Sequence, residues 1–253
     1  MFGGRTIIFN IKVHAMNEQE HVIETFTEMA SRYESLMNNE LNRFWGVSYP
    51  EFVRELVGEI IFSKNLRILD IATGIAFIPQ FISKQELPFD KFAGLDITFE
   101  MLLKAKQQIS GKNIDQTIQL VCASAHAIPF QNGKFDIVTC CLATHHMNTK
   151  LLLDQISSVL KPGGKFHIAD VGGGKRWKNR IIQSIIKAVA FIYFIFKENL
   201  SRAQAESEAV ANIMTIDEWE KLITDHGFSS IKSRELKSKR FWIPNPIILE
   251  AIK

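Results

Sequence analysis

Residues 68–78 read ILDIATGIAFI, an apolar run that contains one carboxylate and continues into a loop of small residues. The part at 68–71 has the composition of a buried strand, and the pattern from residue 76 onward favours a helix. Small residues between a strand and a helix let backbone N–H groups approach a ligand, and the helix N-terminus adds positive potential. The stretch therefore predicts a cradle for a nucleotide-like ligand at the carboxyl edge of a parallel sheet.

Strand-like and helix-like patterns alternate from residue 65 onward. This alternation is typical of a parallel sheet with helices on both faces. We expect core strands at 67–71, 91–96, 117–122, 135–141 and 165–171, with helices between them at 76–84, 99–109 and 150–160. Pro162-Gly163-Gly164 predicts a stop and a turn after the last of these helices.

The segments that flank this core are mainly helical. We expect amphipathic helices at 20–37 and 50–62 as a partial lid over the carboxyl edge, and later helices at 181–196, 201–212 and 216–226. Thr215 is the expected N-cap of the last helix, and Gly227 ends it. Two final strands near 230–236 and 240–252 would close the sheet as a hairpin, with an edge position or a bulge at Pro244 and Pro246. The expected organisation is one domain over 1–253, divided into an N-terminal helical lid (1–64), a cofactor-binding core (65–171), a helical substrate-cap insertion (172–213) and a C-terminal helix with a β-hairpin (214–253).

Composition and charge narrow the function classes. The chain of 253 residues is 46% hydrophobic, enough for a full core, and its net charge of +3 is too slight for a general grip on nucleic acid. Cys122, Cys140 and Cys141 lack metal-ligand spacing and lie in or beside apolar runs, so we expect neither disulfides nor a metal site, and a reducing, cytoplasmic location. The short apolar run at 6–9 is followed at once by polar residues, so we expect no secretion signal.

The segment 181–196 is almost wholly apolar and follows a cluster of Lys and Arg residues. It is shorter than the roughly 20 apolar residues of a membrane-spanning helix. A narrow polar stripe at helical spacing runs along it. We expect a helix that caps the core or lines an apolar pocket. Through it the protein could contact a membrane surface peripherally or form a homodimer.

A second carboxylate strengthens the prediction of a ligand site. Asp96 ends the next expected strand, 26 residues after Asp70, where a carboxylate can accept both hydrogen bonds of a ribose diol. The Gly-x-Gly-x-x-Gly fingerprint of dinucleotide-binding proteins is not met, since its three positions read Ala72, Gly74 and Phe77.

Several blocks in order and at the right spacing resemble the class I S-adenosylmethionine-dependent methyltransferases. After Asp70 and Asp96 these are VCASAHAIPF at 121–130, GKFDIV at 133–138 and VLKPGGKF at 159–166. The N-terminal stretch FTEMASRYESLMN at 26–38, followed by Arg43-Phe44-Trp45, is similar to the ubiquinone and menaquinone C-methyltransferases. The resemblance implies a Rossmann-like α/β fold with a seven-stranded, mostly parallel sheet, one antiparallel strand and helices on both faces.

The resemblance also implies roles for particular positions. Tyr33 would close over the methionine end of S-adenosyl-L-methionine, and Asp96 would hold the ribose hydroxyls. Ile97 and Met101 would sandwich the adenine ring, with Ser124 and Ala125 at its edge. The cofactor-binding set implied in this way is Tyr33, Asp70, Ala72, Thr73, Gly74, Asp96, Ile97, Met101, Ser124, Ala125 and Thr144.

Three positions depart from the family pattern. Ser124 stands where an acidic residue is usual, which removes a charged acceptor for the adenine amino group. Ala76 occupies a place that glycine usually holds in the first loop. His145-His146 replaces the Arg-Asn pair of the quinone enzymes after the fourth strand.

The catalytic candidates are His145, His146 and Asp170. An imidazole can accept a proton near neutral pH while the acceptor atom takes the methyl group, so either histidine could be a general base. Asp170 ends the fifth expected strand and could act as a base or orient a histidine.

The function that these expectations favour is methyl transfer from S-adenosylmethionine to a hydrophobic small molecule, on carbon or oxygen of a quinone, phenol, polyketide or terpenoid-like acceptor. A lipid or amine N-methyltransferase is an alternative. A non-catalytic protein that binds S-adenosylmethionine and a nicotinamide-dependent oxidoreductase are alternatives of other classes. A nucleic-acid methyltransferase of the amino-methylating kind is disfavoured, because Leu142-Ala143-Thr144-His145 stands where that kind has Asn/Asp-Pro-Pro-aromatic.

Overall fold

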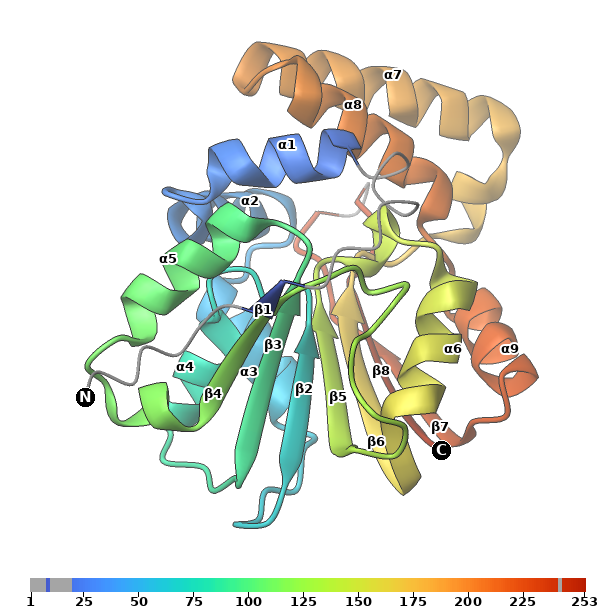
Figure 1. Cartoon of the computed structure of the whole chain (residues 1–253). Helices are drawn as coiled ribbons and strands as arrows, with labels where there is room; N and C mark the ends of the chain where they lie inside the picture. Colours follow the sequence, from blue (N-terminus) through green and yellow to red (C-terminus); the bar gives the residue numbers. More distant parts are fainter. Residues whose placement is uncertain (1–7, 10–19, 241–242) are drawn as a thin grey trace.

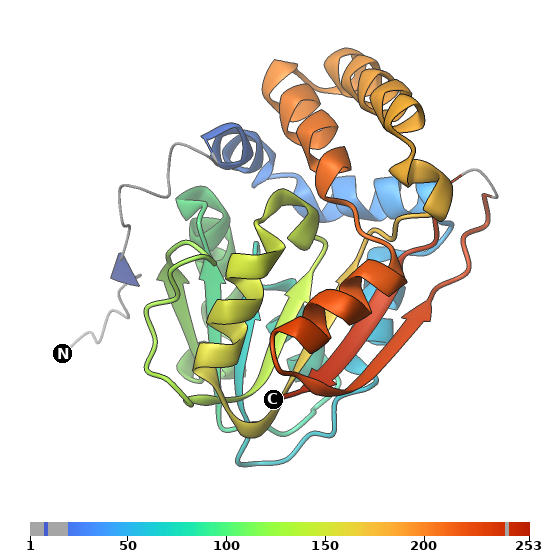
Figure 2. The ribbon, with the colours of Figure 1, turned by 90° about the vertical axis from the view of Figure 1, so that its right-hand side faces the viewer.

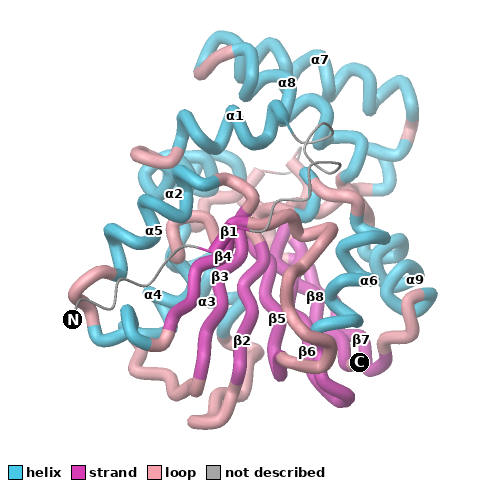
Figure 3. The backbone as a smooth tube through the Cα atoms, viewed as in Figure 1, coloured by secondary structure: helices cyan, strands magenta, loops and turns pink. Residues whose placement is uncertain are grey.

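The computed structural model describes residues 8–9, 20–240 and 243–253, so most of the segment for which no secretion signal is expected lies outside the described residues. Its centre is one mixed sheet with strand order β1-β4-β3-β2-β5-β6-β8-β7 (Figures 1 and 3). The seven expected strands are all present, and β8 is the antiparallel one. A two-residue strand, β1 (Ile8–Phe9), pairs in parallel with the outer side of β4 as an eighth.

The core strands lie close to where the sequence predicts them. They are β2 (Arg67–Ile71), β3 (Lys91–Asp96), β4 (Ile118–Cys122), β5 (Phe135–Cys141) and β6 (Leu160–Asp170). Strand β6 begins earlier than expected, because Leu160 already pairs with Phe135 before the register steps to Ile137 opposite Lys165. The expected turn survives as a bulge at 161–164 within this strand, where Gly163 takes the left-handed φ of 76°.

The two faces of the sheet are covered by different helices. On one face, α3 (Tyr49–Val57), α4 (Phe77–Lys84) and α5 (Phe99–Ile109) pack on side chains such as Ile68 and Ile137. On the other, α6 (Thr149–Val159) and α9 (Ile216–Asp225) pack on the neighbouring strand residues Leu69 and Val138. Because successive strand side chains point to opposite faces, inner strands such as β2 and β5 contribute apolar side chains to both cores.

Helices from both ends of the chain lie over the carboxyl edge of the sheet (Figures 1 and 2). The single helix expected at 20–37 is wrong: a turn at 30–32 divides it into α1 (Glu20–Met29) and α2 (Tyr33–Phe44). The turn lets α1 pack against α5 and α8 while α2 packs against α3. Above them stand α7 (Arg180–Lys197) and α8 (Leu200–Ala209), the latter followed by a 3-10 turn at Val210–Asn212.

Helix ends follow the capping signals in the sequence. Thr215 caps α9 by accepting from the N–H of Glu218, and Gly227 beyond its end has φ 79°. Asn179 caps α7 through the N–H groups of Ile181 and Ile182. Within the described residues, none of the helices has the length and apolarity needed to cross a membrane.

The C-terminal hairpin differs from its predicted form. Strand β7 (Ser229–Glu235) agrees closely, but β8 (Ile247–Ile252) begins after Pro244 and Pro246 rather than at residue 240. Strand β8 lies between β6 and β7, so the expected edge position or bulge at the prolines is wrong. Because proline has no N–H to donate to the ladder, the strand starts only where the prolines end.

Candidate active site

The loop after β2 is held in an unusual backbone conformation. Ala72, Gly74 and Ala76 all have left-handed φ values, of 53°, 53° and 59°. L-residues with a Cβ avoid this region, so the two alanines are strained where glycine would not be. The conformation turns the chain sharply from the strand into α4 and brings the loop backbone toward the end of β3.

Strand β3 is shaped to receive this loop. The N–H of Thr73 donates to the carbonyl of Leu95 at 2.9 Å. A Cβ on Gly94 would lie 2.8 Å from Thr73 Cγ2, so this close approach requires glycine.

Asp96 ties the loop to the start of α5. Its Oδ2 accepts from the N–H of Gly74 and its Oδ1 from the N–H of Thr98, both at 2.8 Å. Burial raises the pKa of Asp96 to about 6, against the hydrogen bonds that lower it. A carboxylate offers about four acceptor positions, so the side chain can still receive two hydroxyl groups from a ligand.

A cavity lies at this point, where the strand order reverses between β2 and β5. Asp96 supplies an acceptor, while Ile97, Met101 and Ala125 supply apolar walls, a combination that fits a ribose joined to a flat base. Of the residues predicted to bind the cofactor, the cavity is lined by Tyr33, Ala72, Gly74, Asp96, Ile97, Met101 and Ala125.

The other four predicted residues, Asp70, Thr73, Ser124 and Thr144, are buried and do not line this cavity. Asp70 Oδ1 accepts from Thr139 Oγ1 at 2.7 Å, and burial raises the pKa of Asp70 to about 7. Ser124 Oγ accepts from the N–H of His126 at 3.2 Å, so this side chain closes its own turn.

Tyr33 comes to the cavity from the N-terminal helices. It begins α2, directly after the turn that the sequence did not predict. Its ring lies over the loop, with Cε1 3.9 Å from where a Cβ on Gly74 would stand. Burial is the main cause that raises the pKa of Tyr33, so its phenol stays neutral.

Asp170, at the end of β6, accepts hydrogen bonds from several donors. His145 Nδ1 lies 2.6 Å from Oδ1, and the N–H of Val171 donates to the same oxygen at 2.7 Å. Oδ2 accepts from the N–H of Thr144 at 2.6 Å, from the Thr144 hydroxyl, and from the N–H of His145 at 3.3 Å.

The contact with Asp170 sets the pKa and the tautomer of His145. Burial alone would raise the pKa of Asp170, but the charge and hydrogen bond of His145 and the other donors outweigh it and lower that pKa. Burial lowers the pKa of His145, yet the carboxylate of Asp170 overcomes this and raises it above its ordinary value. Because Nδ1 is held by Asp170, the neutral imidazole carries its proton there and Nε2 is left as the acceptor.

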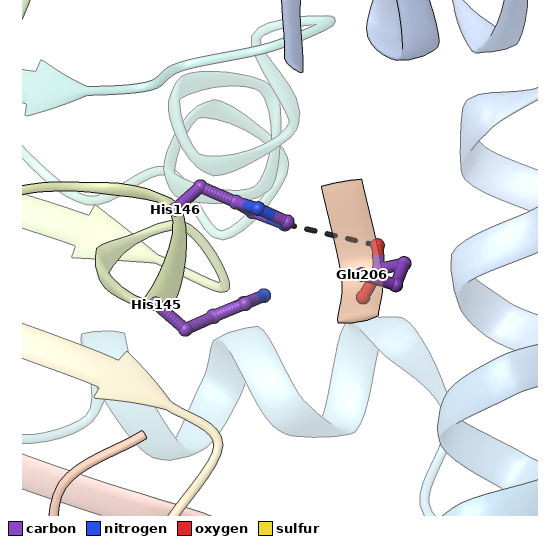
Figure 4. Close-up of side chains that lie close together, drawn as sticks. All are labelled: His145, His146 and Glu206. Atoms are coloured by element: carbon purple, nitrogen blue, oxygen red, sulfur yellow. Dashed lines mark ion pairs between the residues drawn. The ribbon is translucent and has the colours of Figure 1, made fainter. Parts of the chain in front are cut away.

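His146 lies beside His145, and the pKa values of the two imidazoles are shifted in opposite directions. The two rings are 4.2 Å apart, and His146 also meets the ring of Phe26 edge-on. Burial, assisted by the nearby His145, lowers the pKa of His146 to about 3, so this imidazole is neutral at ordinary pH. Its Nε2 points to Glu206 Oε1 on α8, 3.7 Å away (Figure 4).

Among the described residues, His145, His146 and Glu206 have the arrangement that could hold a metal ion. Each of them places one potential ligand atom within 4.8 Å of the others. Arg202 already pairs with Glu206, at 2.9 Å, and supplies positive charge at this point.

A second, larger cavity adjoins the first. Its walls are mostly apolar and come from α2, α7 and α8, with Ile186, Tyr193 and Phe194 on α7. Phe26, Tyr33, Leu142 and His146 line both cavities, so they form the common wall. His145 reaches only the larger one.

The larger cavity also contains a buried ionic cluster that sequence reasoning missed. Arg202 is 3% exposed, pairs with Glu40 at 3.1 Å as well as with Glu206, and stacks over the ring of Phe194. Burial raises the pKa of Glu40 to about 7, although Arg202 opposes this. The i,i+4 spacing of Arg202 and Glu206 is a local signal for their pair, but Glu40 lies 162 residues from Arg202, so the sequence does not predict the buried cluster.

Comparisons with known proteins agree with this geometry. Residues 69–168 match the family described as methyltransferase domain. The ubiquinone/menaquinone biosynthesis C-methyltransferase UbiE of Rickettsia bellii is 27% identical over 237 residues, which cover 89% of this chain and 91% of the relative.

Solved structures share the fold. Phosphoethanolamine N-methyltransferase 2 of Haemonchus contortus, in complex with S-adenosyl-L-methionine, matches with a TM-score of 0.64 and 17% identity over 90% of this chain and 60% of that one. Geranyl diphosphate C-methyltransferase of Streptomyces coelicolor A3(2) matches with a TM-score of 0.60 and 13% identity over 80% of this chain and 74% of that one. Together with the cavity at the ends of β2 and β3, the match to the methyltransferase domain family and the likeness to the Rickettsia relative support an S-adenosylmethionine-dependent methyltransferase that resembles the ubiquinone/menaquinone biosynthesis C-methyltransferases.

Proposed function

We propose that this enzyme methylates an oxygen or an activated ring carbon of a hydrophobic small molecule, of the size and polarity of a quinone, phenol, polyketide or terpenoid. The observation that carries the proposal is the common wall of the two cavities. An acceptor in the larger, apolar cavity would meet the smaller one beside Tyr33, Leu142 and His146. Apolar cavities with a few convergent polar groups are typical of sites for such ligands.

The smaller cavity is the proposed cofactor site. S-adenosylmethionine supplies an electrophilic methyl group there. Asp96 would accept the ribose hydroxyls, and Ile97 and Met101 would hold the adenine ring between them. Tyr33 would cover the reacting end and keep water away, since little besides alignment and dryness is needed for an in-line displacement.

His145 is the proposed general base. Its Nε2 is the acceptor position, it lines the larger cavity, and Asp170 fixes its ring through Nδ1. As the acceptor oxygen or carbon takes the methyl group, Nε2 would remove its proton, and the carboxylate of Asp170 would stabilise the imidazolium. At the common wall, the neutral imidazole of His146 would accept a hydrogen bond from a hydroxyl group of the substrate that receives the methyl group.

The name of the Rickettsia relatives, ubiquinone/menaquinone biosynthesis C-methyltransferase, supports an apolar ring as the acceptor. The His145-His146 pair replaces the Arg-Asn pair of that family, so we infer an acceptor other than that of the quinone enzymes. The polar side chains of the larger cavity, Glu40, Arg202 and Glu206, would meet its oxygen-bearing end.

The proposal is tested by incubating the protein with S-adenosylmethionine labelled in the methyl group and a panel of apolar phenols, quinones, amines and lipid extracts. Label in an organic-phase phenol or ring compound is the expected result. The variant Tyr193→Asp, which places a charge in the α7 wall, should abolish that transfer while S-adenosylhomocysteine still binds. Label found only in amines, protein or RNA would contradict the proposal.

A further inference from the structure

The outward side of α7 is apolar. Of the ten large apolar side chains that are exposed among the described residues, six lie on α7, and a seventh, Leu200, begins α8. At about 100° per residue these six fall within an arc of about 120°. We call this surface the α7 outer face; it consists of Ile181, Ile185, Val189, Ile192, Ile195 and Phe196.

Ile61, Leu103 and Leu151 are single exposed apolar residues elsewhere on the described surface, whereas the α7 outer face gathers six on one helix. Ile181 is 72% exposed and Phe196 86% exposed, at opposite ends of the helix. A contiguous apolar surface of this kind on a protein marks a place where something else binds. The helix stands beside α8 at the outer end of the molecule, away from the sheet (Figures 1 and 2).

Positive charge accompanies this face. Helix α7 contains Arg180, Lys187 and Lys197 and not one acidic residue. Within the described part of the chain, no acidic side chain forms an ion pair with any of these three. Arg180 and Lys187 lie beside one flank of the apolar arc by helical spacing, and Lys197 ends the helix.

The opposite side of the same helix lines the larger cavity, through Ile186, Ala190, Tyr193 and Phe194. One helix thus separates the apolar cavity from the apolar outer surface. Ile185 and Val189 belong to both, being exposed and also part of the cavity wall.

We propose that the α7 outer face lies in the surface layer of an anionic lipid bilayer, with its apolar side chains among the acyl chains and its cations at the lipid phosphates. Helices with an apolar face, cationic flanks and no acids bind membranes in this orientation. Lys and Arg side chains can extend along the helix so that their charged ends reach the headgroups. The larger cavity would then open next to the lipid in which a hydrophobic acceptor dissolves, a link that rests on the proposed function.

Charge favours lipid over a second copy of this chain. Two copies that joined through their α7 outer faces about a two-fold axis would bring Arg180, Lys187 and Lys197 of both into one interface. Like charges there would repel, and α7 offers no acid to compensate them. An anionic bilayer neutralises all three at once.

The test is co-sedimentation of the full chain with vesicles of phosphatidylcholine containing phosphatidylglycerol, compared with vesicles of phosphatidylcholine alone. We expect binding to the anionic vesicles that weakens as salt is added. The triple variant Ile181→Gln, Ile192→Gln and Phe196→Gln should bind at least about tenfold less, since it removes three inserting side chains. None of these three lines the larger cavity. Arg180→Gln, Lys187→Gln and Lys197→Gln should each weaken binding about fivefold.

The matched control is Ile61→Gln, Leu103→Gln and Leu151→Gln, which changes the same number of exposed apolar residues on other parts of the surface and should leave vesicle binding unchanged. Binding is measured without turnover, so its outcome is independent of the acceptor. Failure of the native protein to sediment with anionic vesicles would overturn the inference. So would a dimer in light scattering that the α7 triple variant converts to a monomer, because the face would then be covered by a second copy.

Discussion

Replacing Asp170 by Asn tests the proposed base in detail. The two oxygens of Asp170 accept five hydrogen bonds, and its side chain is 1% exposed. An amide has the same shape but must turn its NH₂ group toward one set of donors. An NH₂ group in place of Oδ2 would face two backbone N–H groups, which cannot accept a hydrogen bond. The NH₂ should therefore take the place of Oδ1, where it faces His145 Nδ1 and the N–H of Val171.

That orientation of the amide reverses the tautomer of His145. With a donor opposite Nδ1, the imidazole must accept there and carry its proton on Nε2, where the base is needed. We expect kcat to fall by about 10²–10⁴, the usual contribution of a positioned base. The unpaired N–H of Val171 should also lower the free energy of unfolding by about 1–3 kcal/mol.

The pH dependence gives a second readout. Asp170 raises the pKa of His145 above 6.5, and catalysis needs the neutral ring, so the acidic limb of kcat/KM for the native enzyme should lie above pH 6.5. In the variant, burial is left to lower that pKa, and the limb should move to lower pH.

The assay is label transfer to the best acceptor from the panel over a pH range, with circular dichroism and S-adenosylhomocysteine titration to verify the fold. In a His145→Ala background, Asp170→Asn should cost little more, because the two act as a unit. A folded Asp170→Asn variant with the native kcat and an unchanged pH profile would refute the reasoning.

Three further substitutions address the loop and the sheet. Ala76→Gly should raise the melting temperature by about 2 °C, because relief of the left-handed alanine, about 1–2 kcal/mol, exceeds the entropy cost of glycine; Ala188→Gly, in the exposed part of α7, is the control and should lower it. The folded-state pKa of Asp70 is about 7, so the native protein loses stability as the pH rises from about 3.8 to 7. Asp70→Asn has no such loss, so in urea unfolding it should be more stable than the native protein at pH 8 by up to about 4 kcal/mol. Near pH 4 the two proteins should not differ in this way. Equal pH dependence of the two proteins would show that Asp70 is ionised throughout. Gly94→Ala should weaken S-adenosylhomocysteine binding about tenfold in calorimetry, because its Cβ would displace Thr73, and native affinity would mean that the loop tolerates the shift.

The sheet could be predicted because its strands are buried on both faces. Strands β2, β3 and β5 have the expected bounds, since a continuous apolar run between turn signals leaves little freedom in register or length. Carboxylates at the ends of such strands, Asp96 and Asp170, could be placed at one edge from topology alone.

Features made by distant segments were not predictable. The turn between α1 and α2 contains neither glycine nor proline, and the pattern across it continues as one helix. Its cause is packing: α1 lies against α8, whose position no local signal gives. The same holds for Arg202: Glu206 lies one turn further along α8, but Glu40 comes from α2, and no local signal predicts that contact. Hydrophobic periodicity reports burial of apolar residues and is silent about buried ion pairs.

The most direct measurement of the central claim is calorimetric titration of S-adenosylhomocysteine into the native protein and into Asp96→Ala and Ser124→Ala. Asp96 lines the smaller cavity, and the loss of one hydrogen bond to a charged acceptor, about 1.5–3 kcal/mol, should weaken binding at least about tenfold. Ser124 Oγ is engaged within its own turn, so Ser124→Ala should bind within about threefold of the native protein. Equal affinity for the native protein and a folded Asp96→Ala would contradict the placement of the cofactor between β2, β3 and Tyr33.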